Sequence, residues 1–257
     1  MASSEKTIRV DRRESFALVT LDQEAKLNAL SSAMVDDLLS TFAELQNDAA
    51  VRAIILTGSQ SVFAASDAKE PAAASPEQIR GLAIKRQSLT ALIENFGKPV
   101  IAAINGMASG SGCDLALACA WRMASPDATF DFSEASSSIG GSVRLAKVIG
   151  KSRALEVLLV GKPISADEAL RIGLINRVAN SAEALLTICE EMARQISRNA
   201  PLAIKYAMES VNHGSELPLS DGLRLESALF GLCFATADVQ EGTKAFAEKR
   251  PPNFIGR

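Results

Sequence analysis

The segment INGMASGSGCDLALACA, residues 104–120, combines small residues with two side chains that could do chemistry. Ser111 lies between two glycines, and Asp114 lies at the start of an apolar, helix-like stretch. Such a turn could carry a nucleophilic serine, a phosphate-binding loop, or backbone amides that stabilise an oxyanion. The surrounding residues distinguish between these three kinds of site.

Two features disfavour a nucleophilic role for Ser111: its neighbouring residues and the lack of a suitable general base. The nucleophile elbow has the pattern G-x-S-x-G, whereas Ser111 lies directly between Gly110 and Gly112. A serine hydrolase also needs a general base, and the single histidine, His213, lies in the polar segment SVNHGSE. We therefore do not expect a Ser-His triad.

A phosphate-binding loop is also disfavoured, because neither a third glycine nor a Walker lysine follows the G-x-G pattern. An oxyanion site fits better, since small residues let the backbone approach a ligand and amides at a helix N-terminus carry partial positive charge. A carboxylate one turn further, here Asp114, can then act as acid or base beside the same carbonyl. A capping role for Asp114 fits the same residues equally well, so the local pattern leaves both roles open.

The composition is that of a protein with a large buried core. The chain has 257 residues, of which 47% are hydrophobic, which suits one large domain or a domain with an appendage. The net charge of −3 offers no broad attraction to nucleic acid or to an anionic membrane. Cys113, Cys119, Cys189 and Cys233 lie in apolar stretches without CxxC spacing, as is typical of reduced thiols.

The N-terminal sequence MASSEKTIRVDRRES lacks the apolar centre of a signal peptide. No stretch reaches the roughly 18 uncharged apolar residues of a membrane span. We therefore expect a cytoplasmic protein that binds neither nucleic acid nor membrane and holds no metal.

Hydrophobic periodicity predicts alternating strands and helices. Strands are predicted within 8–21 (two, around a polar turn), 51–58, 98–105, 128–132 and 173–178, and helices over 31–48, 75–96, 112–120 and from 182 onward. Residues 59–74 are predicted to be a loop, and SPEQ at 75–78 and SADE at 165–168 to be capping boxes. This alternation predicts an α/β protein with a parallel sheet, followed by a helical appendage or oligomerisation element.

Six segments, in order along nearly the whole chain, resemble the enoyl-CoA hydratase/isomerase (crotonase) superfamily. They are KLNALS (26–31), VRAIILTG…FAASDAKE (51–70), KPVIAAINGMASGSGCDLALAC (98–119), ATFDFSE (128–134), RLAKVIGKSRALEVLLVGKPISADEALRIGLINRV (144–178) and EGTKAFAEKRPPNF (241–254). The resemblance implies a crotonase-like spiral of ββα units over 1–195 and a C-terminal helical trimerisation region over 196–257. It also implies a homotrimer, or a hexamer built as a dimer of trimers.

The resemblance further implies an acyl-CoA substrate, with no cofactor apart from the coenzyme A of the substrate itself. Two backbone amides of the family hold the thioester oxygen while it becomes enolate-like. They fall here on Ser111 and on Asp67, or on Ser66 in place of Asp67. The two catalytic carboxylates of the hydratases fall on Asp114 and Glu134.

Further positions match contacts of the family with coenzyme A. The residues implied to bind substrate are Lys26, Ala64, Ala65, Ser66, Gly110, Phe246 and Lys249. The last two match a C-terminal pair that can reach the coenzyme A of a neighbouring subunit.

The chain departs from the family pattern in three places. FAASDAKE has serine where the family has the glycine of FAAGADIKE, and it is shorter. GSG replaces GGG, which keeps the amide of Ser111. ASSSIGGSVRL, after Glu134, is also shorter than its family counterpart and lacks the PGxGG turn.

We expect an enoyl-CoA hydratase, in which Asp114 and Glu134 move the protons. The same site would isomerise a double bond if a single carboxylate were active. Thioester hydrolysis and C–C cleavage are two more reactions that an enolate-forming site could support. A catalytically weak paralogue would only bind acyl-CoA.

Overall fold

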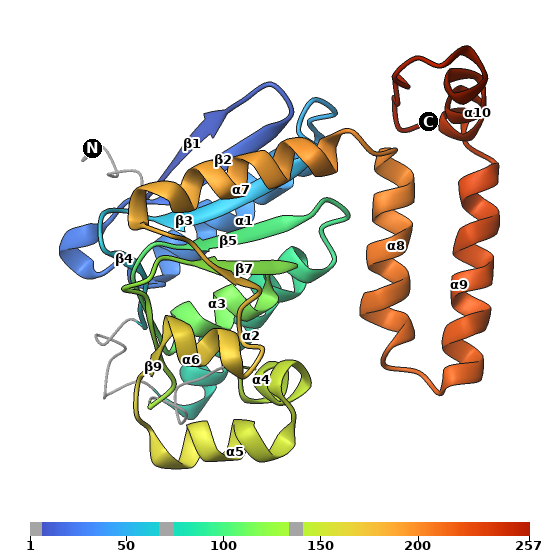
Figure 1. Cartoon of the computed structure of the whole chain (residues 1–257). Helices are drawn as coiled ribbons and strands as arrows, with labels where there is room; N and C mark the ends of the chain where they lie inside the picture. The colour runs from blue at the N-terminus through green and yellow to red at the C-terminus, as the bar shows by residue number, and fades with distance from the viewer. Residues whose placement is uncertain (1–6, 67–74, 134–140) are drawn as a thin grey trace.

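The computed structural model describes residues 7–66, 75–133 and 141–257. Within these residues two sheets form, a larger one in the order β1-β2-β3-β5-β7-β10 and a smaller one in the order β4-β6-β8-β9 (Figure 1). The strands are β1 (Ile8–Arg12), β2 (Phe16–Leu21), β3 (Ala53–Gly58), β4 (Val62–Ala64), β5 (Val100–Ile104), β6 (Met107–Ser109), β7 (Trp121–Ala124), β8 (Thr129–Asp131), β9 (Ile164–Ser165) and β10 (Arg177–Val178).

The larger sheet is parallel except at one edge, where β1 pairs antiparallel with β2. Every residue of β2, β3 and β5 is buried, as expected for strands covered on both faces. Successive side chains of a strand point to opposite faces. Phe16 and Leu18 accordingly face one apolar cluster, while Ala17 and Val19 face the other. The predicted parallel core is therefore confirmed.

In the part of the chain that the structure describes, three ββα units follow one another. They are β3-β4-α2, β5-β6-α3 and β7-β8-α4, in which the helices are α2 (Pro76–Glu94), α3 (Ser111–Ala118) and α4 (Gly141–Ile149). The first strand of each unit joins the larger sheet, and the second joins the smaller sheet, where β4, β6 and β8 pair in parallel. Because these three short strands are parallel, their carboxyl ends lie at the same edge of the smaller sheet.

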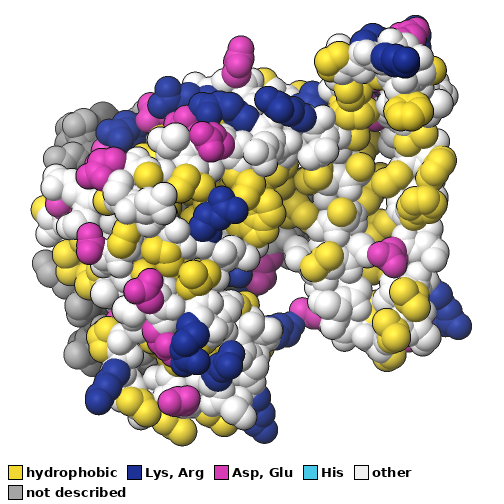
Figure 2. All heavy atoms as spheres, viewed as in Figure 1, with side chains coloured by type: hydrophobic (Ala, Val, Ile, Leu, Met, Phe, Trp, Pro, Cys, Tyr) yellow, Lys and Arg dark blue, Asp and Glu magenta, His cyan; other side chains and the backbone are white. Residues whose placement is uncertain are grey.

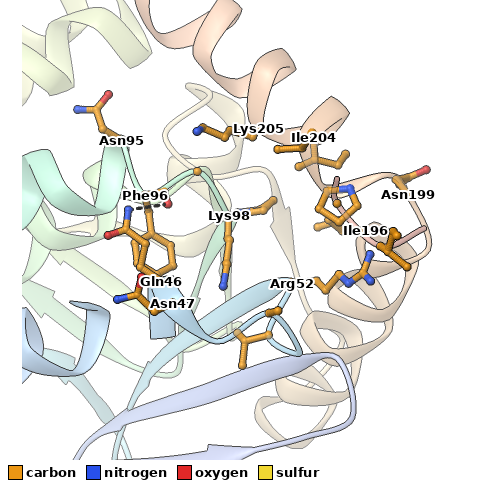
Figure 3. A pocket seen from close by; sticks show the side chains of 18 residues that line it. Gln46, Asn47, Arg52, Asn95, Phe96, Lys98, Ile196, Asn199, Ile204 and Lys205 are labelled. Atoms are coloured by element: carbon orange, nitrogen blue, oxygen red, sulfur yellow. Dashed lines mark hydrogen bonds between the residues drawn. The ribbon is translucent and has the colours of Figure 1, made fainter. Parts of the chain in front are cut away.

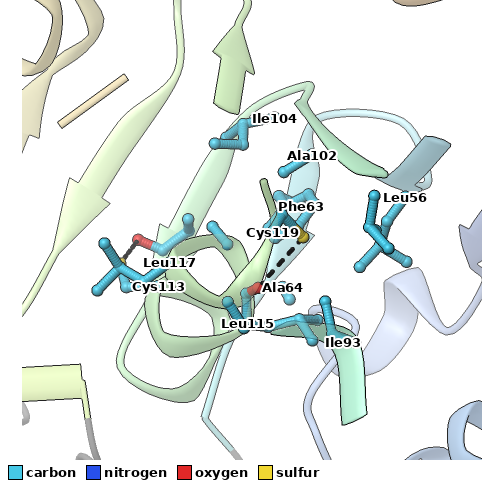
Figure 4. Close-up of a cluster of buried hydrophobic side chains, with 14 of the residues drawn as sticks. Leu56, Phe63, Ala64, Ile93, Ala102, Ile104, Cys113, Leu115, Leu117 and Cys119 are labelled. Carbon is cyan, nitrogen blue, oxygen red and sulfur yellow. Dashed lines mark hydrogen bonds between the residues drawn. The ribbon is translucent and has the colours of Figure 1, made fainter. Parts of the chain in front are cut away.

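Helices cover both faces of the larger sheet. On one face, α1 (Ser32–Asn47) begins at the N-cap Ser31, whose side chain accepts a hydrogen bond from the amide of Met34. On the other face lies α7 (Ala182–Ser197), which buries Leu185, Cys189 and Ala193 against the strands (Figure 1). Helix α3 is buried along its whole length, among β3, β5 and α2 (Figure 4).

The C-terminal helices extend away from the sheets (Figure 1). They are α8 (Pro201–Gly214), α9 (Leu219–Phe234) and α10 (Ala237–Glu248), and α8 packs beside α9. No residue of α8 is buried in the single chain. The predicted boundary between 195 and 196 falls in the last turn of α7, and the division into 1–195 and 196–257 stays a prediction.

Some sequence predictions were wrong in detail. The predicted loop 59–74 contains β4, and the loop before α3 contains β6. The prediction of a strand over 173–178 holds only at its end, because the amides of Leu174 and Ile175 bond to the carbonyl of Ala169 instead of to a neighbouring strand. The periodicity did not predict α4, nor α5 (Lys151–Val160).

The first capping box is confirmed, since Ser75 and Gln78 bond reciprocally. The second is half right. Ser165 caps α6 (Ala166–Arg171), but the Glu168 carboxylate bonds to Arg171. Among the described residues, no helix has the length and apolar composition needed to cross a membrane, and no group of three His, Cys, Asp or Glu could hold a metal.

Three of the cysteines are buried, and their surroundings make them poor nucleophiles. Burial raises the pKa of Cys119 and of Cys189 to about 12, and burial together with the charge of Asp114 raises that of Cys113. Because the thiolate is the reactive form, we expect all three to resist iodoacetamide at pH 8 in the native protein and to react in guanidinium. Mass spectrometry of the labelled peptides measures this, and rapid native labelling of all three would contradict the described core.

Candidate active site

Helix α3 begins immediately after a glycine with an unusual backbone conformation. Gly110 has φ 47° and ψ −113°, a region that residues with side chains rarely adopt. Its amide donates to the carbonyl of Asp131 at 2.9 Å, which ties this turn to the end of β8. The first helical residue is Ser111, so its amide lies at the positive end of the helix.

Ser111 and Asp114 share one face of α3, because residues three apart on a helix are neighbours. Both are nearly inaccessible to solvent, at 3% and 4% exposure. They line the same small cavity, of about 10 Å³, together with residues of α2 and the segment that precedes α1: Leu30, Arg86, Leu89, Thr90 and, from α3 itself, Leu115. The buried carboxylate and the helix start therefore face a common space.

An ion pair connects the helices on either side of α3. Arg144 of α4 donates to both carboxylate oxygens of Glu94 of α2, at 2.6 and 2.8 Å. The hydrogen bond to Glu94 raises the pKa of Arg144, and the charge of Asp114 adds to this effect. Asp114 is thus within the field of a fixed positive charge, in addition to that of the helix N-terminus.

The end of β4 packs against the start of α3 with no space for a side chain between them. A Cβ on Gly112 would lie 2.0 Å from the carbonyl oxygen of Ala64. The carbonyl of Ala65 accepts from the amide of Leu30 at 3.1 Å. These contacts hold the residues that follow β4 against α3.

The Ser66 side chain completes this contact. Its hydroxyl oxygen accepts a hydrogen bond from the amide of Ser111 at 2.9 Å, and the two hydroxyl oxygens are 3.4 Å apart. The structure therefore brings together Ala64, Ala65, Ser66, Gly110 and Ser111, whose roles in binding stay predictions.

The segment that contains Lys26 runs along the same edge. Lys26 is exposed at the end of a short 3-10 helix, η1 (Glu24–Lys26). Two residues later, the buried Asn28 donates from its side chain to the carbonyl of Val62 at 2.9 Å. Lys26 thus precedes a segment that is anchored to β4 and to Ala65.

The other predicted site residues have different outcomes. Asp67 and Glu134 lie outside the described residues. Ser133, which precedes Glu134, donates its amide to the Asp131 carboxylate at 2.8 Å. Phe246, which is 88% exposed, and Lys249 lie on and next to α10, far from α3 in this chain (Figure 1).

Asn105 is a site-building residue that the sequence analysis did not single out. Its side chain accepts from the amide of Gly58 at 3.0 Å and donates to the carbonyl of Gln60 at 2.7 Å. It therefore joins the ends of β3 and β5, where two units turn toward the smaller sheet. The available signal was the Asn-Gly pair directly after a buried strand.

Larger cavities lie elsewhere among the described residues, and two of them adjoin α8. One, of about 480 Å³, lies between the larger sheet and α8 and is lined by Arg52, Lys98 and Lys205 (Figure 3). Lys98 donates to the carbonyls of Leu45 and Asp48, and Arg52 to that of Phe254, so two of these cations hold the fold together. The other, of about 590 Å³, adjoins the Glu94–Arg144 pair and the exposed His213 at the end of α8. Ser111 lines neither cavity, and His213 lines only the second.

The sequence model of one family, described as enoyl-CoA hydratase/isomerase, matches residues 11–257. The chain belongs to this family. It is 36% identical to the short-chain-enoyl-CoA hydratase of Clostridium acetobutylicum, with 94% of each chain covered. It is 35% identical to the crotonyl-CoA hydratase of Syntrophomonas wolfei, with 97% of this chain and 98% of the relative covered.

A solved structure agrees with this assignment. The enoyl-CoA hydratase of Bacillus anthracis superposes with a TM-score of 0.93 at 34% identity, over 98% of this chain and all of that one. The predicted crotonase fold of the enoyl-CoA hydratase/isomerase family is therefore confirmed.

The contact between Gly112 and Ala64 gives a test of the site. We expect Gly112→Ala to destabilise the protein by about 3 kcal/mol, because its Cβ overlaps backbone atoms that cannot move without shifting β4. Gly81→Ala is the matched control. It lies in exposed α2 with nothing within 4 Å, and it should stabilise by about 1 kcal/mol. Thermal unfolding measures both, and equal melting temperatures would contradict the described packing.

Proposed function

We propose that the protein is an enoyl-CoA hydratase, which adds water across the 2,3 double bond of an enoyl-CoA thioester. The two relatives above and the matching solved structure are named as hydratases of enoyl-CoA or crotonyl-CoA, which supports the reaction. The assignment of the reaction to particular residues rests on one observation, that Ser111 and Asp114 lie on the same face of α3.

The amide of Ser111 is the proposed donor to the thioester oxygen. A donor fixed at a helix N-terminus does not have to reorganise when negative charge develops on that oxygen. The second proposed donor is the amide of Asp67, whose position follows from the family pattern alone. Together the two amides would carry the charge of the enolate.

Two carboxylates are proposed to move the protons, Asp114 and Glu134. One takes a proton from water as the hydroxyl adds to the β-carbon, and the other orients the water and supplies the proton that the α-carbon gains. The buried position of Asp114 beside the start of α3 supports this role. For Glu134, the support is that Asp131, three residues earlier, accepts a hydrogen bond from the amide of Gly110, the residue before Ser111.

The C-terminal helices are proposed to assemble a homotrimer, or a hexamer of two trimers. Figure 2 shows hydrophobic side chains on the surface of α8 and α9. The large apolar side chains exposed on these two helices and the turn between them are Val211, Leu217, Leu219, Leu223, Phe230, Leu232 and Phe234. A monomer rarely leaves so many in one region. In such an assembly, Phe246 and Lys249 would contact the coenzyme A of a neighbouring subunit.

An asymmetric pair of variants tests the chemistry. We expect Asp114→Asn to reduce hydration of crotonyl-CoA by roughly 100-fold or more, because a proton-transfer group is lost. Ser111→Gly should change the rate only mildly, since the amide is retained. The decrease in absorbance of the enoyl thioester measures the hydration rate of both variants. A severe loss of activity in Ser111→Gly, together with retained activity in Asp114→Asn, would contradict the assignment.

Glu134→Gln tests the second acid separately. We expect a loss of similar size, roughly 100-fold, with the binding of crotonyl-CoA retained. Mass spectrometry of the product distinguishes hydration, which adds the mass of water, from isomerisation, which does not change the mass. Full hydratase activity in Glu134→Gln would rule out the proposed pair of carboxylates.

Size-exclusion chromatography with light scattering tests the assembly. We expect a mass of three or six times the 27.1 kDa of the chain. Phe230→Glu should lower that mass, because a charge would replace an apolar contact. A wild-type monomer would contradict the proposed assembly.

A further inference from the structure

The amide proposed to hold the thioester oxygen already has a hydrogen-bond acceptor within the chain. The hydroxyl oxygen of Ser66 lies 2.9 Å from the nitrogen of Ser111. We propose that Ser66 is an internal competitor for the oxyanion position, and that its hydroxyl must leave the Ser111 amide before a carbonyl oxygen can bind there. The identity of the incoming group as an acyl-CoA thioester rests on the proposed function.

The competition follows from geometry. An effective oxyanion donor lies 2.7–3.1 Å from the oxygen that it stabilises, and the Ser66 oxygen is already within that range. Because Ser111 has a single N–H, a second oxygen cannot make the same well-aligned hydrogen bond while the first remains. The two acceptors therefore exclude one another.

The fold allows the hydroxyl to leave. A serine side chain has three staggered rotamers, and Ser66 is only partly buried. Rotation about the Cα–Cβ bond would move the oxygen without any change in the backbone that Ala64 and Gly112 hold in place. The hydroxyl could then bond to water, so the cost of displacing it is limited to the hydrogen bond from the Ser111 amide and the long contact, 3.4 Å, with the Ser111 hydroxyl.

Displacing the Ser66 hydroxyl is expected to weaken the binding only of ligands whose carbonyl oxygen takes its place. A neutral hydrogen bond contributes about 0.5–1.5 kcal/mol net, which corresponds to a factor of roughly 2 to 10 in a dissociation constant. Without the Ser66 hydroxyl, a ligand with a thioester oxygen should bind tighter by this factor. A ligand that lacks this oxygen should gain nothing.

Calorimetric titration with two saturated ligands tests the proposal without requiring turnover. Butyryl-CoA contains the thioester oxygen, and the thioether S-butyl-CoA lacks it. We expect Ser66→Ala and Ser66→Gly to bind butyryl-CoA roughly 2- to 10-fold tighter than the unchanged protein, with the same affinity for S-butyl-CoA. Ser61→Ala is the matched control, because Ser61 is an exposed serine on the same segment; it should change neither affinity.

Each contrary result overturns the inference. Unchanged or weaker butyryl-CoA binding by both Ser66 variants would show that the hydroxyl does not compete. An equal gain for both ligands would show a change of pocket shape unrelated to the amide. No binding of butyryl-CoA by any of these proteins would overturn the inference together with the acyl-CoA site. Selective tightening in a protein that hydrates no enoyl-CoA would support the inference and refute the hydratase proposal alone.

Discussion

The site depends on one close approach, in which the carbonyl of Ala64 occupies the space where residue 112 would carry a side chain. This contact joins the end of one ββα unit to the helix of the next, backbone against backbone. It holds Ser66 within hydrogen-bond distance of the Ser111 amide. A similar close approach occurs where the first two units turn from the larger sheet to the smaller one, because a Cβ on Gly58 or Gly106 would also lie within 2 Å of a carbonyl oxygen.

Such close backbone contacts require that nearby polar groups find partners, since buried donors and acceptors left unmatched are costly. Two asparagines meet this need. Asn105 bonds to the amide of Gly58 and the carbonyl of Gln60, and Asn28 bonds to the carbonyl of Val62. Both side chains act at the turns between the sheets, so they fix where the strands of the smaller sheet begin. The positions of Ala64 and Ser111 follow from these turns.

Local signals in the sequence predicted the parts of the fold that local physics decides. The capping residues at 75–78, the buried strands 51–58 and 98–105, and the placement of Asp114 in the first turn of a helix that follows Ser111 all belong to this class. The strands β4 and β6 did not, because three small or apolar residues become a strand only by pairing with a distant segment. The Glu94–Arg144 pair and the bond between Ser66 and Ser111 join residues 50 and 45 positions apart. The resemblance marked Ser66 as a contact, but a family glycine at this position has no hydroxyl whose role could be transferred.

The arrangement of charge explains how a buried carboxylate and a developing enolate can share one site. In the proposed hydration, a carboxylate accepts a proton while negative charge appears on the thioester oxygen, so the charge moves and its total does not change. A site for such a step needs positive potential at both places where the charge resides. The N-terminus of α3 supplies it at the Ser111 amide, and Arg144 contributes it at Asp114, reduced by the negative charge of Glu94 to which Arg144 is bonded. Since Glu94 fixes Arg144 between α2 and α4, this potential is part of the fold and requires no reorganisation during the reaction.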